Sequence, residues 1–116
     1  MHGYYGLTIL EAEDRKNAIK TEWELAELYA EVSNKAWTVE DDVYDFKEGT
    51  KQHAWAVEHS HRWFALYRQL QEEIFAILKV EGVQIPETKQ IEVLKPFMKR
   101  NGYDDRGGWW KRQEKN

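Results

Sequence analysis

Few residues in this chain can interrupt regular secondary structure, and this scarcity limits its possible folds more than any other feature. The 116 residues include seven glycines and two prolines, the residues that most often end helices and strands. Apolar residues make up 41% and charged residues 33%, a balance typical of globular chains. We therefore expect a few long elements in a single domain, residues 1–116, rather than many short strands.

The N-terminal third of the sequence predicts one long amphipathic helix. Thr8 and Glu11 have the spacing of a capping box, in which a hydroxyl caps the helix and a glutamate follows three residues later. From Ala18 to Ala36 apolar residues recur at spacings of three and four, which places them on one helix face. The helix is predicted over about residues 9–35.

A short helix and a second long helix are predicted to follow. Thr38 and Gly49 are suitable residues to begin and end the short helix. Thr50 is a suitable cap for a helix over about residues 51–81, which would stop at Gly82. The two long helices are expected to be antiparallel, so the predicted fold class is all-α, a small helical bundle.

The helix predicted over 51–81 has more apolar surface than one neighbouring helix can cover. Its main apolar stripe centres on Trp63, and a second flank holds Val57, Phe64 and Phe75. The other members of the main stripe are Ala56, Tyr67, Leu70, Ile74, Ile77 and Leu78. Either the C-terminal helix or a second copy of the chain must cover this second flank. The surplus predicts a homodimer.

The C-terminal third is predicted to contain one more helix and an aromatic tail. Pro86 suits the first position of this helix, and Asn101–Gly102 would end it. Pro96 is expected to kink or restart the helix. Residues 102–116 are broken by glycines and predict a loop or a small hairpin.

Three histidines lie close together in the sequence, at positions 53, 59 and 61. On a helix their side chains point in different directions, so they do not form a metal site. His59 is predicted to be a hydrogen-bonded histidine near the core, with His53 and His61 more exposed. The chain has no cysteine, which excludes thiolate metal sites and disulfides, and we expect no cofactor.

The acidic residues form a second candidate site. Glu24 and Glu27, followed by Asp42 and Asp45, make a pattern that resembles the all-α nucleotide pyrophosphohydrolases of the MazG type. The resemblance covers residues 24–45, and Asp42 stands where the family has a glutamate. It implies carboxylates that hold magnesium against a nucleotide triphosphate, and hence a magnesium-dependent hydrolase.

Helical geometry favours another role for these carboxylates. Residues 11–48 carry twelve acids and five bases, and the helical glutamates fall opposite the apolar stripe. A solvated acidic face that attracts a partner is therefore the preferred interpretation. Its candidate residues are Glu24, Glu27, Glu31, Asp41, Asp42 and Asp45.

The tail reverses this charge, since residues 95–116 carry seven bases and three acids. Three roles are open for it: binding of single-stranded nucleic acid, a protein interface, or packing against the wide flank of the long helix. The acidic net charge of −4 makes nucleic acid the less favoured partner. The candidate residues are Arg106, Trp109, Trp110, Lys111 and Arg112.

The leading functional hypothesis is a non-enzymatic interaction or regulatory protein. The sequence has no nucleophile elbow, phosphate-binding loop or zinc-protease motif. Its composition is similar to that of phage and mobile-element accessory proteins, some of which inhibit a host nucleic-acid-processing protein. The N-terminus has no signal-peptide pattern and no segment is apolar enough for a membrane helix, so a cytoplasmic protein is expected. Nucleic-acid binding and the magnesium hydrolase are the alternatives.

Overall fold

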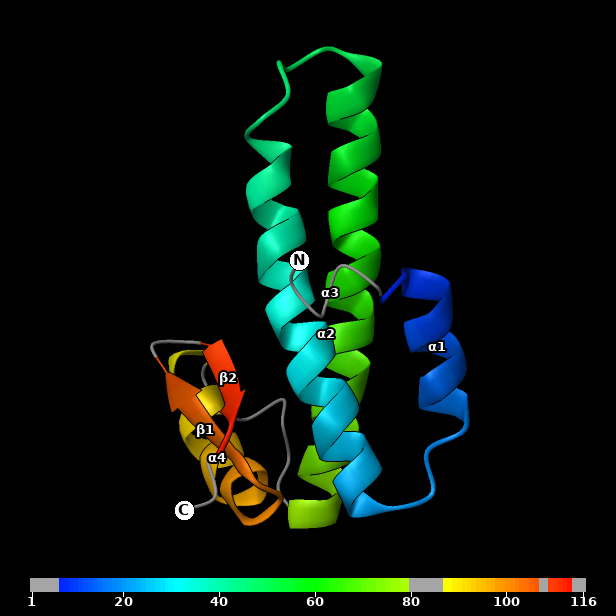
Figure 1. The fold of residues 1–116 in the computed structure, drawn as a ribbon. Coiled ribbons are helices and arrows are strands. Elements are labelled where there is room, and N and C mark those ends of the chain that lie inside the picture. The colour runs from blue at the N-terminus through cyan, green and yellow to red at the C-terminus, as the bar shows by residue number, and fades with distance from the viewer. Residues whose placement is uncertain (1–6, 80–86, 107–108, 114–116) are drawn as a thin grey trace.

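The protein is built around two long antiparallel helices, α2 and α3 (Figure 1). The computed structural model describes residues 7–79, 87–106 and 109–113. In these ranges α1 lies on one side of the long pair, and α4 and a β-hairpin lie on the other. The described elements are α1 (Ile9–Asn17), α2 (Glu22–Val43), α3 (Lys51–Leu78), α4 (Glu87–Arg100), β1 (Tyr103–Arg106) and β2 (Trp109–Arg112). The described residues are mostly helical, as predicted, and β1 and β2 form a small hairpin, one of the two structures predicted for the tail, which adds two strands to the all-α class.

The helix predicted over residues 9–35 is two helices, because a second capping box restarts the chain. Thr21 Oγ1 accepts the Glu24 backbone N–H at 3.1 Å. In return Glu24 Oε1 accepts the Lys20 backbone N–H at 3.3 Å and the Thr21 hydroxyl at 3.0 Å. Such reciprocal bonds satisfy donors that a helix start leaves unpaired. The break changes the helical phase, so Ala18 and Trp23 lie outside the core.

The short helix predicted over residues 38–49 was wrong. Helix α2 continues to Val43, and Thr38 lies inside it, where its hydroxyl donates to the Asn34 carbonyl at 3.0 Å. A threonine in this position bonds back along its own helix and does not cap a new one. Turns then connect Tyr44 to Thr50, which caps α3 by accepting the His53 backbone N–H at 3.1 Å, as predicted.

The ends of the last two helices differ in part from the prediction. Lys79 ends α3 in the left-handed conformation with φ of 58°, and the predicted stop at Gly82 lies outside the described residues, as does Pro86. Helix α4 continues through Pro96, which therefore does not restart it. Pro96 is exposed, so water can satisfy the carbonyl group that its missing N–H leaves free. Gly102, with φ of 94°, follows the end of α4 as expected.

The core lies between α2 and α3 and extends to α1, α4 and the hairpin. Tyr29, Trp63, Leu70 and Ile74 are fully buried at its centre, which confirms most of the predicted stripe on α3. Ile77, also predicted to be in this stripe, is 42% exposed.

An ion pair joins the end of α4 to the beginning of α2. The Arg100 guanidinium donates to the Glu22 carboxylate, and Asn101 Nδ2 donates to the same group at 2.9 Å. The Arg100 and Asn101 hydrogen bonds lower the pKa of the Glu22 carboxyl below its ordinary value.

Replacing Thr21 with alanine should destabilise the protein, because α2 would lose its cap. A lost cap costs about 1 kcal/mol, whereas Thr21→Ser keeps the hydroxyl and should cost only a few tenths of that. Urea unfolding followed by circular dichroism measures both. Equal midpoints for Thr21→Ala and Thr21→Ser would contradict this account of the break.

Candidate functional site

The C-terminal hairpin is docked onto α2 by a pair of buried hydrogen bonds. Asn34 Nδ2 donates to the Trp110 carbonyl at 2.9 Å, and the Trp110 backbone N–H donates to Asn34 Oδ1 at 3.0 Å. The Trp110 ring lies 6.0 Å from the Tyr29 ring and is 4% exposed. Of the three roles open for the tail, Trp110 therefore has the packing role. It packs on α2, whereas the prediction placed it on the apolar flank of the helix that is now α3.

Arg112, at the end of the hairpin, also contacts α2. Its guanidinium lies over the rings of Trp23 and Tyr103, at 5.9 Å and 5.7 Å from their centres, and 3.8 Å from the Glu27 carboxylate. Cation–π contacts of this kind favour a fixed position for the arginine. Of the other tail candidates, Arg106 and Lys111 are exposed, and Trp109 is half-buried and has its own contacts.

The candidate glutamates Glu24, Glu27 and Glu31 of α2 do not form a free acidic face. Arg15 of α1 lies 3.7 Å from the Glu27 carboxylate and 2.6 Å from that of Glu31. Glu24 is engaged in the cap of α2. Glu27 and Glu31 therefore join α1 and the hairpin to α2, whereas Glu24 stabilises the start of α2 itself. Because such partly exposed pairs contribute about 1 kcal/mol or less each, their main effect is to orient the elements.

The two halves of the carboxylate pattern are not brought together. Glu24 and Asp42 lie on the same helix, and eighteen residues of α2 separate them by about 27 Å. Magnesium ligands must lie within about 2.1 Å of one ion, so these groups cannot share one. Within residues 7–79, 87–106 and 109–113 no cluster of three metal-ligating side chains occurs.

His59 makes a hydrogen bond, as predicted, but it is half-buried, as His53 is. Trp63 Nε1 donates to His59 Nε2 at 3.2 Å, and the His59 ring stacks on Trp55 at 4.8 Å. His61 is exposed and His53 is half-buried. Burial is the largest cause of a lowered pKa for His59, which keeps the ring neutral and able to accept from Trp63.

A further set of acidic side chains lies where α2 ends and turns toward α3, a segment that we call the acidic tip, residues 40–48. The tip contains five acidic residues and one lysine. In the part of the chain that the structure describes, none of the five forms an ion pair. The candidates Asp41, Asp42 and Asp45 are exposed here, beside Tyr44, which is 80% exposed.

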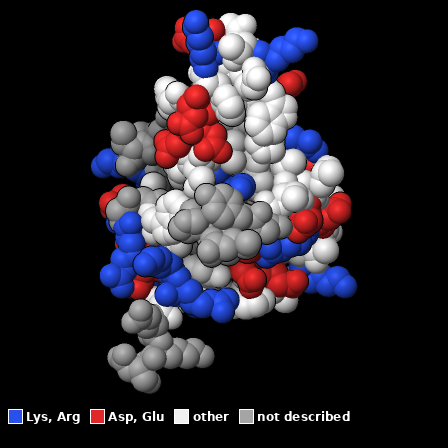
Figure 2. All heavy atoms as spheres, turned by 45° about the horizontal axis from the view of Figure 1, so that its top comes forward, with Lys and Arg blue, Asp and Glu red and all other residues white. Residues whose placement is uncertain are grey.

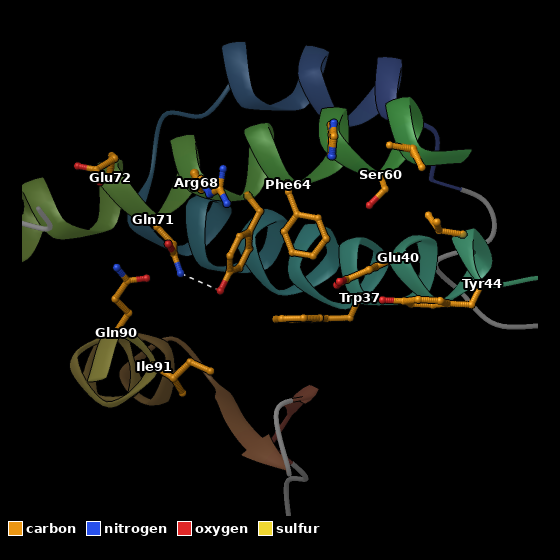
Figure 3. Close-up of a pocket in the computed structure, with 14 residues that line it drawn as sticks. Trp37, Glu40, Tyr44, Ser60, Phe64, Arg68, Gln71, Glu72, Gln90 and Ile91 are labelled. Carbon is orange, nitrogen blue, oxygen red and sulfur yellow. Dashed lines mark hydrogen bonds between the residues drawn. The ribbon is translucent and has the colours of Figure 1, made fainter. Parts of the chain in front are cut away.

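An open groove of about 970 Å³ runs from the tip along α2 and α3 (Figure 3). Its floor is aromatic: the Trp37 and Phe64 rings meet edge to face at 5.3 Å, and Phe64 meets Tyr67 in the same way at 5.9 Å. Gln71 donates to the Tyr67 hydroxyl at 2.8 Å in the deeper part of the groove. We call this the aromatic groove; its lining also includes Glu40, Tyr44, Val57, Arg68, Gln90 and Ile91.

Sequence reasoning missed the aromatic groove, although one signal for it was present. Val57 and Phe64 belong to the second apolar flank of the long helix, and both line the groove. Phe75, on the same flank, is buried. The part of the second flank at Phe75 is thus covered, whereas the part at Val57 and Phe64 lines the groove.

Comparisons with known proteins give no assignment, since no protein-family model, curated protein or solved structure matches this chain. Among the described residues, no helix is both long and apolar enough to cross a membrane.

Replacing Trp110 with alanine should destabilise the whole protein by about 3–5 kcal/mol, because a large buried ring is lost. Trp109→Ala is the matched control and should cost less, since Trp109 is only half-buried. Urea unfolding monitored by circular dichroism measures both changes. A Trp110→Ala protein as stable as Trp109→Ala would show that the hairpin does not depend on this ring.

The stability of the protein should fall as His59 becomes protonated. The pKa of His59 is lower in the folded protein than its ordinary value of 6.5, so protons bind more readily to the unfolded chain. The free energy of unfolding should therefore decrease below about pH 6.5 and level off below the folded pKa. His59→Gln keeps an acceptor for Trp63 but does not titrate, so its loss of stability between pH 7.5 and 5 should be smaller. Identical pH slopes in urea unfolding would contradict this role.

Proposed function

We propose that this protein is a non-enzymatic interaction module that binds a basic protein partner through the acidic tip and the aromatic groove beside it. The observation that carries the proposal is the contrast between two sets of acidic residues. Glu22, Glu27 and Glu31 are paired with arginines of the same chain, whereas the acids of the tip have no ion pair among the described residues and lie next to exposed aromatic rings.

The surface around the tip combines the two features of a protein interface. Trp37 is 44% exposed, and together with Tyr44 it offers rigid apolar area that gains free energy on burial. The unpaired acids around it attract a basic surface and increase the association rate. Figure 2, in which the tip is turned toward the viewer, shows acidic side chains beside uncharged surface in its upper half.

The partner class follows from this charge. Nucleic-acid-processing proteins line their substrate channels with lysine and arginine, and an acidic tip placed in such a channel would inhibit them. The protein would then regulate such a partner, and would do so in the cytoplasm. Origin in a phage or mobile element rests on composition alone and stays a prediction.

A homodimer remains part of the proposal, with the aromatic groove as its interface. Because α4 and the hairpin already lie beside the lower half of α2 and α3, we propose that a second copy, if it binds, uses the aromatic groove. It would then compete with another partner for the same surface.

Reversing the charge of the tip should abolish binding to a basic probe. The variant is Asp41→Lys, Asp42→Lys and Asp45→Lys, and the probe is a fluorescent lysine-rich peptide followed by anisotropy. We expect its affinity to fall by at least about tenfold, which corresponds to about 1.4 kcal/mol. Parent binding should also weaken as salt rises, because attraction between exposed charges is screened.

The matched control has the same net charge but an intact tip: Asp14→Lys, Glu58→Lys and Glu73→Lys, three exposed acids elsewhere. It should bind the peptide nearly as well as the parent. Equal loss in both variants would mean that the peptide responds only to net charge, and the tip would not be the site.

A further inference from the structure

We infer that the aromatic groove binds one amphipathic α-helix of a basic partner, about 15 residues long, with lysine or arginine at the end that lies against the acidic tip. This inference rests on the proposed function, because it assumes that the tip selects a basic partner. It adds the secondary structure, length and polarity of the segment that binds.

The length of the groove fits a helix of this size. Its lining follows α3 from Val57 to Glu72, and the fifteen helical steps between them span about 22 Å. A four-turn helix has the same length. Gln90 and Ile91 of α4 lie across one end, and the other end opens at the acidic tip (Figure 3).

The shape of the groove also favours a helix. Two antiparallel helices leave a hollow along their line of contact, and a third helix packs there at an axial distance of about 8–10 Å. Trp37, Phe64 and Tyr67 line this hollow from α2 and α3. Apolar residues on one face of the incoming helix, at spacings of three, four and seven, would contact these rings.

The charges around the groove determine the polarity of the bound helix. Glu40 lies on the rim at the tip end and continues into the unpaired acids of residues 40–48. Arg68 and Glu72 lie on α3 further from the tip and offset one another, so the net negative charge of the groove lies at the tip end. A helix with basic residues near the tip is therefore complementary. Nucleic acid and anionic lipid surfaces carry the wrong charge for this site.

Three synthetic peptides of about 15 residues test the inference by fluorescence anisotropy. The first has a leucine stripe at helical spacing and lysines clustered near one end. The second has the same composition with the leucines scrambled, so that no stripe forms. The third has the stripe with glutamate in place of lysine. Circular dichroism reports whether a peptide becomes helical when bound.

Two protein variants locate the binding. The groove variant, Trp37→Ala with Tyr44→Ala, removes exposed rings of the lining. The control variant, Leu10→Ala with Trp55→Ala, removes exposed apolar side chains elsewhere. We expect the striped lysine peptide to bind and become helical, to lose at least about tenfold in affinity with the groove variant, and to bind the control variant as it binds the parent.

The other outcomes contradict either the helical segment or the basic partner. If the scrambled peptide binds equally well and only the tip reversal weakens it, the helix is wrong and the proposed function stands. If the glutamate peptide binds as tightly as the lysine peptide, the basic partner is wrong and the proposed function fails with it. If the striped lysine peptide does not bind, or light scattering shows a stable dimer that the groove variant converts to monomer, the inference is wrong.

Discussion

The junction of α2, α3 and the hairpin depends on the burial of Tyr29. This residue of α2 is fully buried, stacks on Tyr67 of α3 at 5.6 Å and meets the ring of Trp110 from the hairpin. Gln71 Nε2 lies 3.4 Å from its hydroxyl. Burial, the largest cause, raises the pKa of this hydroxyl well above its ordinary value, so the group stays neutral in the core. One side chain thus joins α2, α3 and the hairpin.

This arrangement gives the molecule two unequal halves. Around Tyr29 the long pair is flanked by α1, α4 and the hairpin, whereas the upper part of the pair stands above them (Figure 1). A pair of helices without neighbours cannot bury both of its faces. The exposed rings of Trp37 and Tyr44 follow from this geometry, and so does the groove that they line.

Local patterns in the sequence predicted most of the elements but not their contacts. Thr50 was correctly identified as a cap because Gly49 precedes it and an apolar helical pattern follows it. The Thr21 cap was missed although its spacing to Glu24 equals that of Thr8 to Glu11, because apolar residues continue across the break and suggested a single helix. Helical periodicity is a weak guide when a new helix begins within one turn of the last.

The docking of the hairpin was beyond local patterns altogether. Asn34 and Trp110 are 76 positions apart, and a mid-helix asparagine has many possible partners. The sequence showed a basic aromatic tail, and only the fold shows that Trp110 is core and that Arg112 is held between two rings.

The fold also separates the acidic residues into two groups, those paired with arginine and those that remain available to a partner. The sequence contains one continuous acidic region over residues 11–48, and nothing in it distinguishes structural from free carboxylates. The fold makes that distinction, because among the described residues Arg15, Arg100 and Arg112 pair with acids in the first half of α2. A carboxylate already paired with arginine gains little free energy from a basic partner, since binding would have to replace an existing ion pair. The acids of the tip have no such pairs among the described residues, so their attraction for a partner is undiminished.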